Sequence, residues 1–253
     1  MNLLVISNDD KTWLLPAWSK FESGFYPGSK VYYALLPDRL TSYNRQQTLF
    51  WAFKVFGWKQ ASLLSFFSVL RILRYFNQSR VIAKNALKIS QINVDEILQY
   101  ISKFKIDAVV ITCSYIIPVE LLEKSNVPWI NKHSSLLPNC RGLFPYIWGK
   151  IHGFPSGVTY HLINQYIDQG ELLFQKRIRG NKSLVEFYSH IFDYFPQDCK
   201  LAIEIAVGNL KRILDANVGP EVYFSLPDKN DLDLFYASGG KIITFKDLTL
   251  LYK

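Results

Sequence analysis

The sequence is short of cysteine and of long apolar runs. Its 253 residues include three cysteines, odd in number and widely spaced, so neither a disulfide framework nor a C-x-x-C metal site is expected. The first ten residues, MNLLVISNDD, have no basic segment before the apolar run and no small-residue cleavage site, which is atypical of a signal peptide. We therefore expect a cytoplasmic protein whose first strand begins near the N-terminus and which binds no metal.

Charge is also sparse. Charged residues make up 20% of the chain, and no cluster of five or more basic residues occurs. The 29 Lys and Arg against 21 Asp and Glu give a net charge of +8, which favours anionic partners such as nucleotide diphosphates, polyglutamylated folate, nucleic acid or acidic lipid. A solvated lysine-rich surface explains this charge equally well. With 49% hydrophobic and 15% aromatic residues, the chain has an ordinary globular composition.

Several apolar runs predict buried strands, namely NLLVIS, SKVYYALLP, KIDAVVITCSY and VPWINK. The segment INVDEILQYISKFK predicts a crossover helix with Asn93 or Asp95 near its cap. This order indicates an α/β fold with a Rossmann-like, mostly parallel twisted sheet flanked by helices. We expect a later helical region, from SLVEF onward, to be interrupted near Pro196 and to close at Gly219.

The chain is expected to divide into a catalytic domain and a small addition. Residues 1–215 are predicted to form the domain, with a helical insert at about 46–90, and residues 216–253 a C-terminal extension built from a helix and a β-hairpin. Within 46–76, the uncharged stretch between Lys59 and Arg71 is eleven residues long. A helix of that length covers roughly 16 Å, against the ~30 Å of a bilayer core, so it is too short to cross a membrane. A buried helix pair is favoured over a self-association surface, and that over a segment lying on a membrane.

Residues 129–145, WINKHSSLLPNCRGLFP, place Asn131 and His133 two positions apart at the end of an apolar run. The side-chain period of a strand is two, so both side chains point to the same side of the sheet. Asp168 follows in an I-D-Q-G turn between two β-rich runs and can reach the same edge. An amide, an imidazole and a carboxylate at a carboxyl edge suit acid/base chemistry, and we predict a catalytic role for them. The other histidines are assigned to surface or hydrogen-bonded positions: His152, His161 and His190.

The stretch from Ile130 to Gln175 resembles the core signature of the folate-dependent formyltransferases, N-x-H-x-S-x-L-P-x-x-R-G followed by G-x-T and D-x-G. The matching residues are Asn131, His133, Ser135, Leu137, Pro138, Arg141, Gly142, Gly157, Thr159, Asp168 and Gly170. The resemblance implies a formyltransferase fold and the transfer of a formyl group from the co-substrate N10-formyltetrahydrofolate to an amine. It also places the catalytic roles on Asn131, His133 and Asp168.

In the resembling enzymes, the pterin of the folate lies in a slot between the loop after one central strand and the loop that carries the aspartate. An apolar slot rich in backbone groups suits a flat heterocycle. The matching positions here are Tyr115, Ile116, Ile117, Ile163, Asn164, Gln165, Tyr166 and Ile167. Weaker candidates for contacts with the acceptor lie in the first loop: Asn8, Asp9, Lys11 and Trp13.

The resemblance leaves several amine acceptors to compare. Methionyl-tRNA formyltransferases carry a further C-terminal domain, whereas 83 residues follow Gly170 here, so nucleic acid is not the expected partner. Glycinamide ribonucleotide enzymes have a Gly-Ser-rich first loop where this chain has SNDDKTW, and formyltetrahydrofolate hydrolases have an added N-terminal domain. Nucleotide-linked amino sugars, used for O-antigen or similar lipopolysaccharide synthesis, are therefore favoured. The alternatives are methionyl-tRNA and a non-catalytic folate-binding scaffold, and homodimerisation is a further hypothesis.

Overall fold

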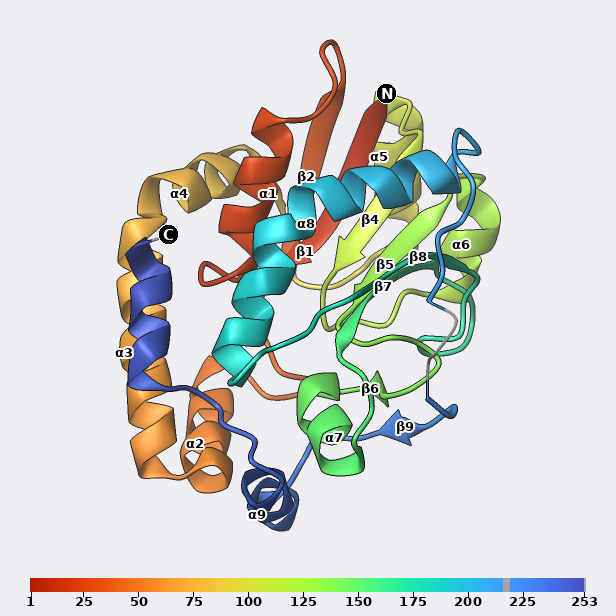
Figure 1. Cartoon of the computed structure of the whole chain (residues 1–253). Coiled ribbons are helices and arrows are strands. Elements are labelled where there is room, and N and C mark those ends of the chain that lie inside the picture. Colours follow the sequence, from red (N-terminus) through yellow and green to blue (C-terminus); the bar gives the residue numbers. More distant parts are fainter. Residues whose placement is uncertain (216–218, 253) are drawn as a thin grey trace.

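The computed structural model describes residues 1–215 and 219–252, which form a seven-stranded sheet with helices on both faces (Figure 1). The first five strands of the spatial order are parallel, the sixth runs antiparallel to them, and the seventh runs antiparallel to the sixth and so in the direction of the first five. This arrangement confirms the predicted α/β class with a mostly parallel sheet. In spatial order the strands are β3 (Leu87–Lys88), β2 (Lys30–Leu36), β1 (Asn2–Asn8), β4 (Ala108–Thr112), β5 (Trp129–His133), β7 (Gly157–Leu162) and β8 (Leu172–Arg177).

The central strands form because their residues are apolar on both faces. Leu3, Leu4, Val5 and Ile6 of β1 have no exposed surface, and all of β4 is buried. Continuous apolar runs of this kind are typical of parallel strands that are covered on both sides by helices. A second sheet has two short strands, β6 (Arg141–Gly142) and β9 (Tyr223–Phe224).

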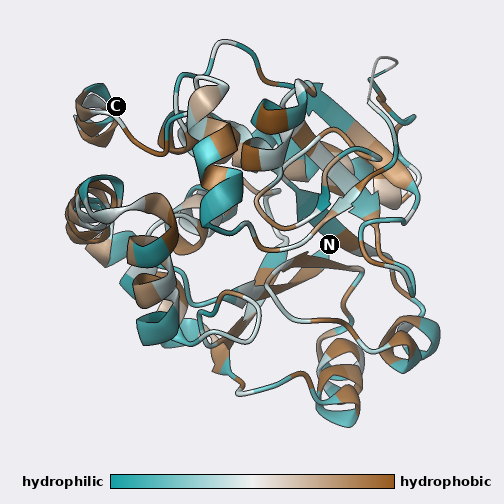
Figure 2. Cartoon of the chain, turned by 90° about the horizontal axis from the view of Figure 1, so that it is seen from below, coloured by the Kyte–Doolittle hydropathy of each residue, from teal (hydrophilic) through white to brown (hydrophobic). Residues whose placement is uncertain are grey.

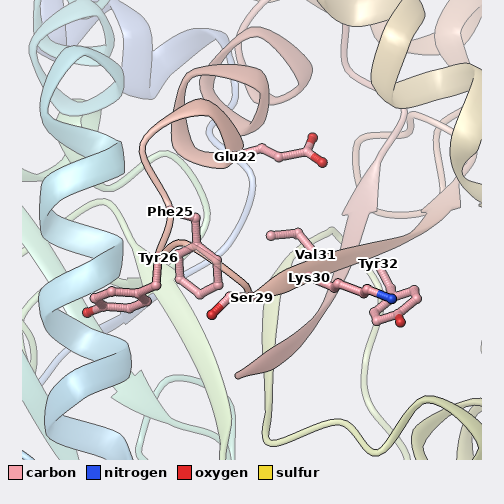
Figure 3. Close-up of a pocket in the computed structure, with 7 residues that line it drawn as sticks. All are labelled: Glu22, Phe25, Tyr26, Ser29, Lys30, Val31 and Tyr32. Atoms are coloured by element: carbon pink, nitrogen blue, oxygen red, sulfur yellow. The ribbon is translucent and has the colours of Figure 1, made fainter.

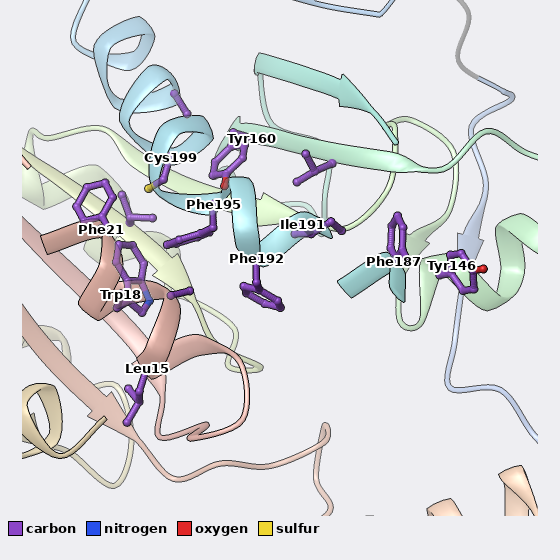
Figure 4. Close-up of a cluster of buried hydrophobic side chains, with 14 of the residues drawn as sticks. Leu15, Trp18, Phe21, Tyr146, Tyr160, Phe187, Ile191, Phe192, Phe195 and Cys199 are labelled. Atoms are coloured by element: carbon purple, nitrogen blue, oxygen red, sulfur yellow. The ribbon is translucent and has the colours of Figure 1, made fainter. Parts of the chain in front are cut away.

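Two buried apolar clusters lie on the two faces of the large sheet. One cluster lies under α1 and α8, where Trp18 packs edge-on against Phe21 and Phe195 with ring centroids 5.2 and 4.7 Å away (Figures 1 and 4). The other lies under α5 and α6. The helices are α1 (Leu14–Ser23), α2 (Arg45–Phe56), α3 (Trp58–Arg74), α4 (Phe76–Asn85), α5 (Val94–Phe104), α6 (Val119–Ser125), α7 (Pro145–His152), α8 (Leu184–Ala206) and α9 (Lys229–Ala237).

The helix α5 begins where the sequence predicts. The Asn93 side chain accepts a hydrogen bond from the Glu96 amide, so of the two candidates Asn93 is the cap. The predicted break of α8 near Pro196 is wrong, because the helix continues through this proline to Ala206, short of Gly219. Phe195 and Cys199 on either side of Pro196 are fully buried, and this packing holds the helix together despite the missing amide hydrogen.

Residues 219–252 of the C-terminal extension contain the predicted helix, α9, but not the predicted β-hairpin. Residues Phe245–Tyr252 form a 3-10 helix, η1. The Asp247 carboxylate accepts hydrogen bonds from the amide and the hydroxyl of Thr244, at 2.6 and 3.0 Å, which closes a helical turn at this point. The preceding carbonyls of Lys241 and Ile242 accept the first amides of α8 and leave no strand to pair.

The region predicted as a helical insert contains α2, α3 and α4, which lie along one edge of the molecule together with η1 (Figure 1). Ala61, Phe67 and Arg71 of α3 face the core, but the opposite side of this helix is exposed. The favoured interpretation, a buried helix pair, is therefore correct for one side only. Figure 2 shows apolar and polar residues alternating along these outer helices. In the described part of the chain, no helix combines the length and the apolar character that crossing a membrane requires.

Candidate active site

The predicted catalytic residues lie where two antiparallel strands meet. Asn131 of β5 stands opposite His161 of β7, and His133 stands opposite Thr159. Trp129 belongs to the cluster under α5 and α6, so by alternation Asn131 and His133 point to that side of the sheet. The register of β5 against β7 thus places an amide and two imidazoles around the carboxyl end of β5.

Asp168 sits in the turn after β7 and brings its carboxylate to this group. Its Oδ2 atom accepts a hydrogen bond from the Gly142 amide at 2.9 Å and lies 3.4 Å from His133 Nδ1. Its Oδ1 atom lies 3.4 Å from Asn131 Nδ2 and 3.6 Å from His161 Nε2. The three residues named from the sequence are therefore in contact, although 37 positions separate Asn131 from Asp168.

Two glycines of the signature make this approach sterically possible. A Cβ on Gly170 would lie 1.5 Å from the Leu162 carbonyl oxygen, so only glycine lets the turn close against β7. Gly142 has φ of +91°, and a Cβ there would lie 2.1 Å from the Phe224 carbonyl oxygen. The D-x-G and R-G patterns of the sequence thus hold the aspartate and the amide that binds it.

The S-S-L-L-P turn after β5 is fixed by a buried network around Thr159. The Thr159 hydroxyl donates to the Ser135 carbonyl at 2.7 Å and accepts from the Leu137 amide at 3.0 Å. The Gln175 side-chain amide donates to the Leu137 carbonyl at 2.7 Å and to the Thr159 hydroxyl at 3.1 Å. Satisfied buried networks of this type are rigid, so the G-x-T motif supports the turn that follows His133.

The electrostatics of Asp168 and His133 are linked. Burial acts to raise the pKa of Asp168, but the adjacent His133, a hydrogen bond from His161 and the Gly142 amide hold this pKa well below the usual carboxyl range. Burial lowers the pKa of His133, against the opposing effects of Asp168 and the Cys140 carbonyl. Asp168 is therefore an anion at neutral pH, and the protonation of His133 is coupled to that charge.

His133 has an acceptor near each ring nitrogen. Its Nε2 atom lies 2.8 Å from the Cys140 carbonyl oxygen, a distance at which an N–H donates. Its Nδ1 atom faces the Asp168 carboxylate at 3.4 Å. A proton taken up at Nδ1 would immediately gain an acceptor, so this pair can take a proton from a nearby reacting group and hold it.

His161 belongs to this cluster, and the sequence interpretation missed it. Its Nδ1 atom lies 2.8 Å from the Leu162 carbonyl oxygen, a distance at which an N–H donates, and its Nε2 atom faces Asp168 Oδ1 at 3.6 Å. Asn131 Nδ2 lies 3.2 Å from that Nε2 atom. The signal was present in the T-x-H spacing, because Thr159 and His161 share one face of β7, but it required the register of β7 against β5.

The predicted pterin slot lies at the ends of β4 and β7. Tyr115 and Ile163 pack against the same apolar cluster, and Ile117 is buried within it. The side chains of Ile116, Tyr166 and Ile167 are exposed by 79, 57 and 49% and remain accessible to a flat ligand. The other two predicted positions are Asn164, which accepts the Tyr166 amide at 2.9 Å and donates to Gln169, and Gln165, which is exposed.

The first-loop candidates lie at the carboxyl end of β1, but most have partners within the protein. Asn8 is buried and exchanges hydrogen bonds with Ser114, at 3.1 and 3.2 Å. Asp9 pairs with Lys88 at 3.6 Å, and Trp13 stacks on Phe192 with ring centroids 5.6 Å apart. Lys11 is exposed.

Two charged side chains near this edge were not predicted from the sequence. Asp10 is buried, which raises its pKa to about 6, and its carboxylate accepts the amides of Thr12 and Trp13 at the start of α1. Lys132 points away from the cluster, toward α8. Burial lowers its pKa to about 8, and its ammonium donates to the Ser134 hydroxyl at 3.0 Å.

One hollow of the molecule lies far from this cluster. It has a volume of about 260 Å³ and opens between the end of α1 and the start of β2, with Glu22, Tyr26 and Lys30 in its lining (Figure 3). This is the amino edge of the parallel strands, whereas the carboxyl edge carries the cluster of Asn131, His133 and Asp168. The hollow and the candidate active site therefore lie at opposite edges of the sheet.

Part of the chain matches a known protein family. Residues 71–184, which include the whole cluster, match the formyl transferase family. A curated relative, the methionyl-tRNA formyltransferase of Thermodesulfovibrio yellowstonii, is 41% identical over 75 residues. That match covers 29% of this chain and 24% of the relative, so the chain aligns with about a quarter of the relative's length.

Solved structures share the fold over most of the chain. A sugar N-formyltransferase from Shewanella sp FDAARGOS_354 has a TM-score of 0.57 at 21% identity, covering 99% of this chain and 86% of that one. Glycinamide ribonucleotide transformylase 1 from Symbiobacterium toebii has a TM-score of 0.56 at 17% identity, covering 85% of this chain and 94% of that one. Likeness at this identity concerns the fold. The match to the formyl transferase family covers residues 71–184, and these residues include Asn131, His133 and Asp168.

Proposed function

We propose that this protein transfers a formyl group from N10-formyltetrahydrofolate to the amino group of a nucleotide-linked amino sugar. The observation that carries the proposal is the Asp168 carboxylate, held between the Gly142 amide, His133 and Asn131 at 2.9, 3.4 and 3.4 Å. This arrangement joins a fixed anion, a titratable imidazole and an amide donor at the sheet edge where ligands bind in α/β folds.

Formyl transfer creates a negative charge and a positive charge, and these groups would stabilise both. The amine nitrogen attacks the formyl carbon, a C–N bond forms, and the formyl oxygen becomes anionic while the nitrogen becomes cationic. Asn131 would donate to the oxygen, which competes for the amide with the long 3.4 Å contact to Asp168. The His133 and Asp168 pair would accept the ammonium proton, and the bond between the formyl carbon and folate N10 then breaks with protonation of N10.

The folate is a co-substrate that supplies the formyl group, and no enzyme nucleophile is needed. The proposed slot between the loop after β4 and the Asp168 turn uses the exposed Ile116, Tyr166 and Ile167 together with backbone groups. The turn from Asn164 to Gln169 is held by its own side-chain hydrogen bonds, which gives the slot a defined wall. A preformed apolar slot of this kind suits a pterin ring.

The nucleotide part of the acceptor would bind to a positively charged side chain, that of Arg39, at the same edge of the sheet. The Arg39 guanidinium lies over the Tyr115 ring, 3.4 Å from its centroid, directly beside the proposed slot. Among the described residues, Arg39 Nε is buried without a hydrogen-bond partner. A buried guanidinium donor of this kind suits a diphosphate, and exposed Lys11 would add a second positive charge.

The chain would divide into a catalytic domain and a C-terminal extension. Residues 1–215 would form the catalytic domain and 216–253 an extension that pairs β9 with β6 and joins Glu221 to Arg141 at 2.9 Å. The extension would support the loop that carries Gly142. A cytoplasmic enzyme of this type would supply formylated sugar nucleotides for O-antigen or related lipopolysaccharide synthesis.

Methionyl-tRNA is the second candidate acceptor, because a curated methionyl-tRNA formyltransferase is 41% identical to this chain over 75 residues. Purified protein would be incubated with N10-formyltetrahydrofolate and a panel of amino-sugar nucleotides, glycinamide ribonucleotide or methionyl-tRNA. We expect release of tetrahydrofolate and a formylated product with a sugar nucleotide. Formylation of methionyl-tRNA alone would replace this acceptor, and folate binding without transfer to any amine would reject the enzyme assignment.

A further inference from the structure

The helices α2, α3 and α4 carry large apolar side chains that point into solvent. Phe50, Trp58 and Leu73 are exposed by 75, 69 and 66%, and Phe66, Val69 and Phe76 by more than half. Phe66, Val69 and Leu73 follow one another at intervals of three and four residues, so they form one stripe along α3, opposite the buried Phe67 and Arg71. Exposed apolar patches of this extent mark interaction surfaces.

The same segment has charge of one sign only. Residues 39–94 contain nine Lys and Arg and no Asp or Glu, although the whole chain has 21 acidic residues. Several of these basic side chains are exposed: Arg45, Lys54, Lys59, Arg74, Arg80 and Lys84. Within the described residues, no carboxylate lies in ion-pair distance of any of these six. We call the exposed side chains of α2, α3 and α4 the basic helical surface.

We propose that the basic helical surface binds the face of an anionic lipid bilayer. Exposed apolar residues on a helix with cationic flanks are the pattern by which a helix lies at a membrane interface, with its apolar side at the level of the acyl chains. Lys59 and Arg74, near the two ends of α3, would remain among the acidic headgroups. Figure 1 shows these helices along one edge, where a flat surface can reach them.

Charge decides between this partner and others. A second copy of the chain would bring the same positive surface against its own kind, which like-charge repulsion opposes. Nucleic acid would satisfy the charge, but the aliphatic side chains of Val69 and Leu73 cannot stack on bases and would gain little from that contact. An anionic bilayer suits both the charge and the apolar stripe of Phe66, Val69 and Leu73, whether the side chain is aromatic or aliphatic.

The surface is connected with the proposed active site. Trp51 of α2 packs against Phe144, with ring centroids 5.2 Å apart. Phe144 lies two residues after Gly142, whose amide binds Asp168. Membrane attachment would therefore hold the enzyme through helices that also pack beside its catalytic loop, while the carboxyl edge of the sheet supplies the catalytic residues.

Co-sedimentation of the full chain with vesicles tests the proposal. We expect binding to vesicles of phosphatidylcholine with about one third phosphatidylglycerol, little binding to pure phosphatidylcholine, and release by high salt. Phe66→Ser with Leu73→Ser, and separately Lys59→Glu with Arg74→Glu, should each lower the partition coefficient on the order of tenfold or more. Circular dichroism and thermal melts would verify that these surface variants fold.

Matched changes outside the surface serve as controls. Leu210→Ser with Leu214→Ser, and Lys103→Glu with Lys211→Glu, alter equally exposed side chains and should leave vesicle binding unchanged. Equal binding to neutral and anionic vesicles, or equal loss in the controls, would overturn the proposal. So would a dimer in sedimentation velocity that the surface variants dissociate, or retention of tRNA in place of vesicles. Formyl transfer in vesicle-free solution, measured on the same variants, reports separately on the proposed function.

Discussion

Two regions of the molecule differ in the kind of side chain that they bury: residues 129–170, which contain the candidate active site, and residues 45–85, which form the outer helices α2, α3 and α4. Between residues 129 and 170, several buried polar groups have hydrogen-bond partners within the protein, as in the network of Ser135, Leu137 and Thr159. Between residues 45 and 85, apolar groups point outward and Arg71 is buried. Few residue types can form the hydrogen bonds that a buried polar group needs. A sequence motif in such a region therefore indicates the geometry of a site. Exposed apolar side chains do not contribute to the core, so the fold alone does not explain their presence on the surface.

The largest effect is expected at Asp168, where the site would lose its anion. Asp168→Asn keeps the shape but removes the charge that accepts from the Gly142 amide and faces His133. We expect kcat for formyl transfer to fall by roughly a thousandfold with a modest change in folate affinity. Asp193→Asn on the exposed side of α8 is the control. Single-turnover kinetics that show an unchanged rate for Asp168→Asn would reject its catalytic role.

Gly170→Ala tests how tightly the turn that carries Asp168 packs against β7. The added Cβ would meet the Leu162 carbonyl oxygen at 1.5 Å, so the turn must move and we expect a loss of about 3 kcal/mol or more in the free energy of unfolding. Gly24→Ala has 3.9 Å of clearance at the end of α1 and should change stability by less than about 1 kcal/mol. Urea denaturation measures both variants. Similar effects would show that the turn is not constrained in this way.

Replacing Lys132 tests how much stability the protein loses by holding an ammonium group between β5 and α8. Its pKa is lowered from 10.5 to about 8, so between these pH values the folded protein holds fewer protons than the unfolded chain. Stability therefore rises with pH across that window, and the full cost of the charge is present below pH 8. We expect Lys132→Met to raise the free energy of unfolding by about 2 kcal/mol at pH 7 and to flatten this rise. Loss of stability at pH 7 would contradict this account.

Arg39 gives the smallest expected effect and sharpens the assignment of the acceptor site. Arg39→Ala removes the guanidinium above Tyr115, and we expect KM for the nucleotide sugar to rise about tenfold with little change in kcat. Lys103→Ala, on the distant helix α5, is the control. If instead KM for the folate rises, Arg39 binds the co-substrate, and if neither KM changes, the residue has no part in binding.

The sequence predicted the α/β class, the helix that begins after Asn93, and the meeting of Asn131, His133 and Asp168. The cap at Asn93 and the shared side of Asn131 and His133 depend on local spacing, because a capping asparagine and a strand period of two act over a few residues. Asp168 is 37 positions from Asn131, and the resemblance to the formyltransferase signature supported its place beside them. His161 was missed because its place depends on the register of β7 against β5, a long-range property. The hairpin predicted in the extension was wrong because Asp247 closes a turn with Thr244, which strand propensity does not show.

The most direct test is a double-mutant cycle on kcat for formyl transfer with His133→Ala, Asp168→Ala and the double variant. Because the imidazole and the carboxylate lie 3.4 Å apart and would handle one proton together, each single change should reduce kcat by roughly a hundredfold or more, and the double variant should be little slower than either. Multiplied losses in the double variant, or full activity in either single variant, would contradict the account.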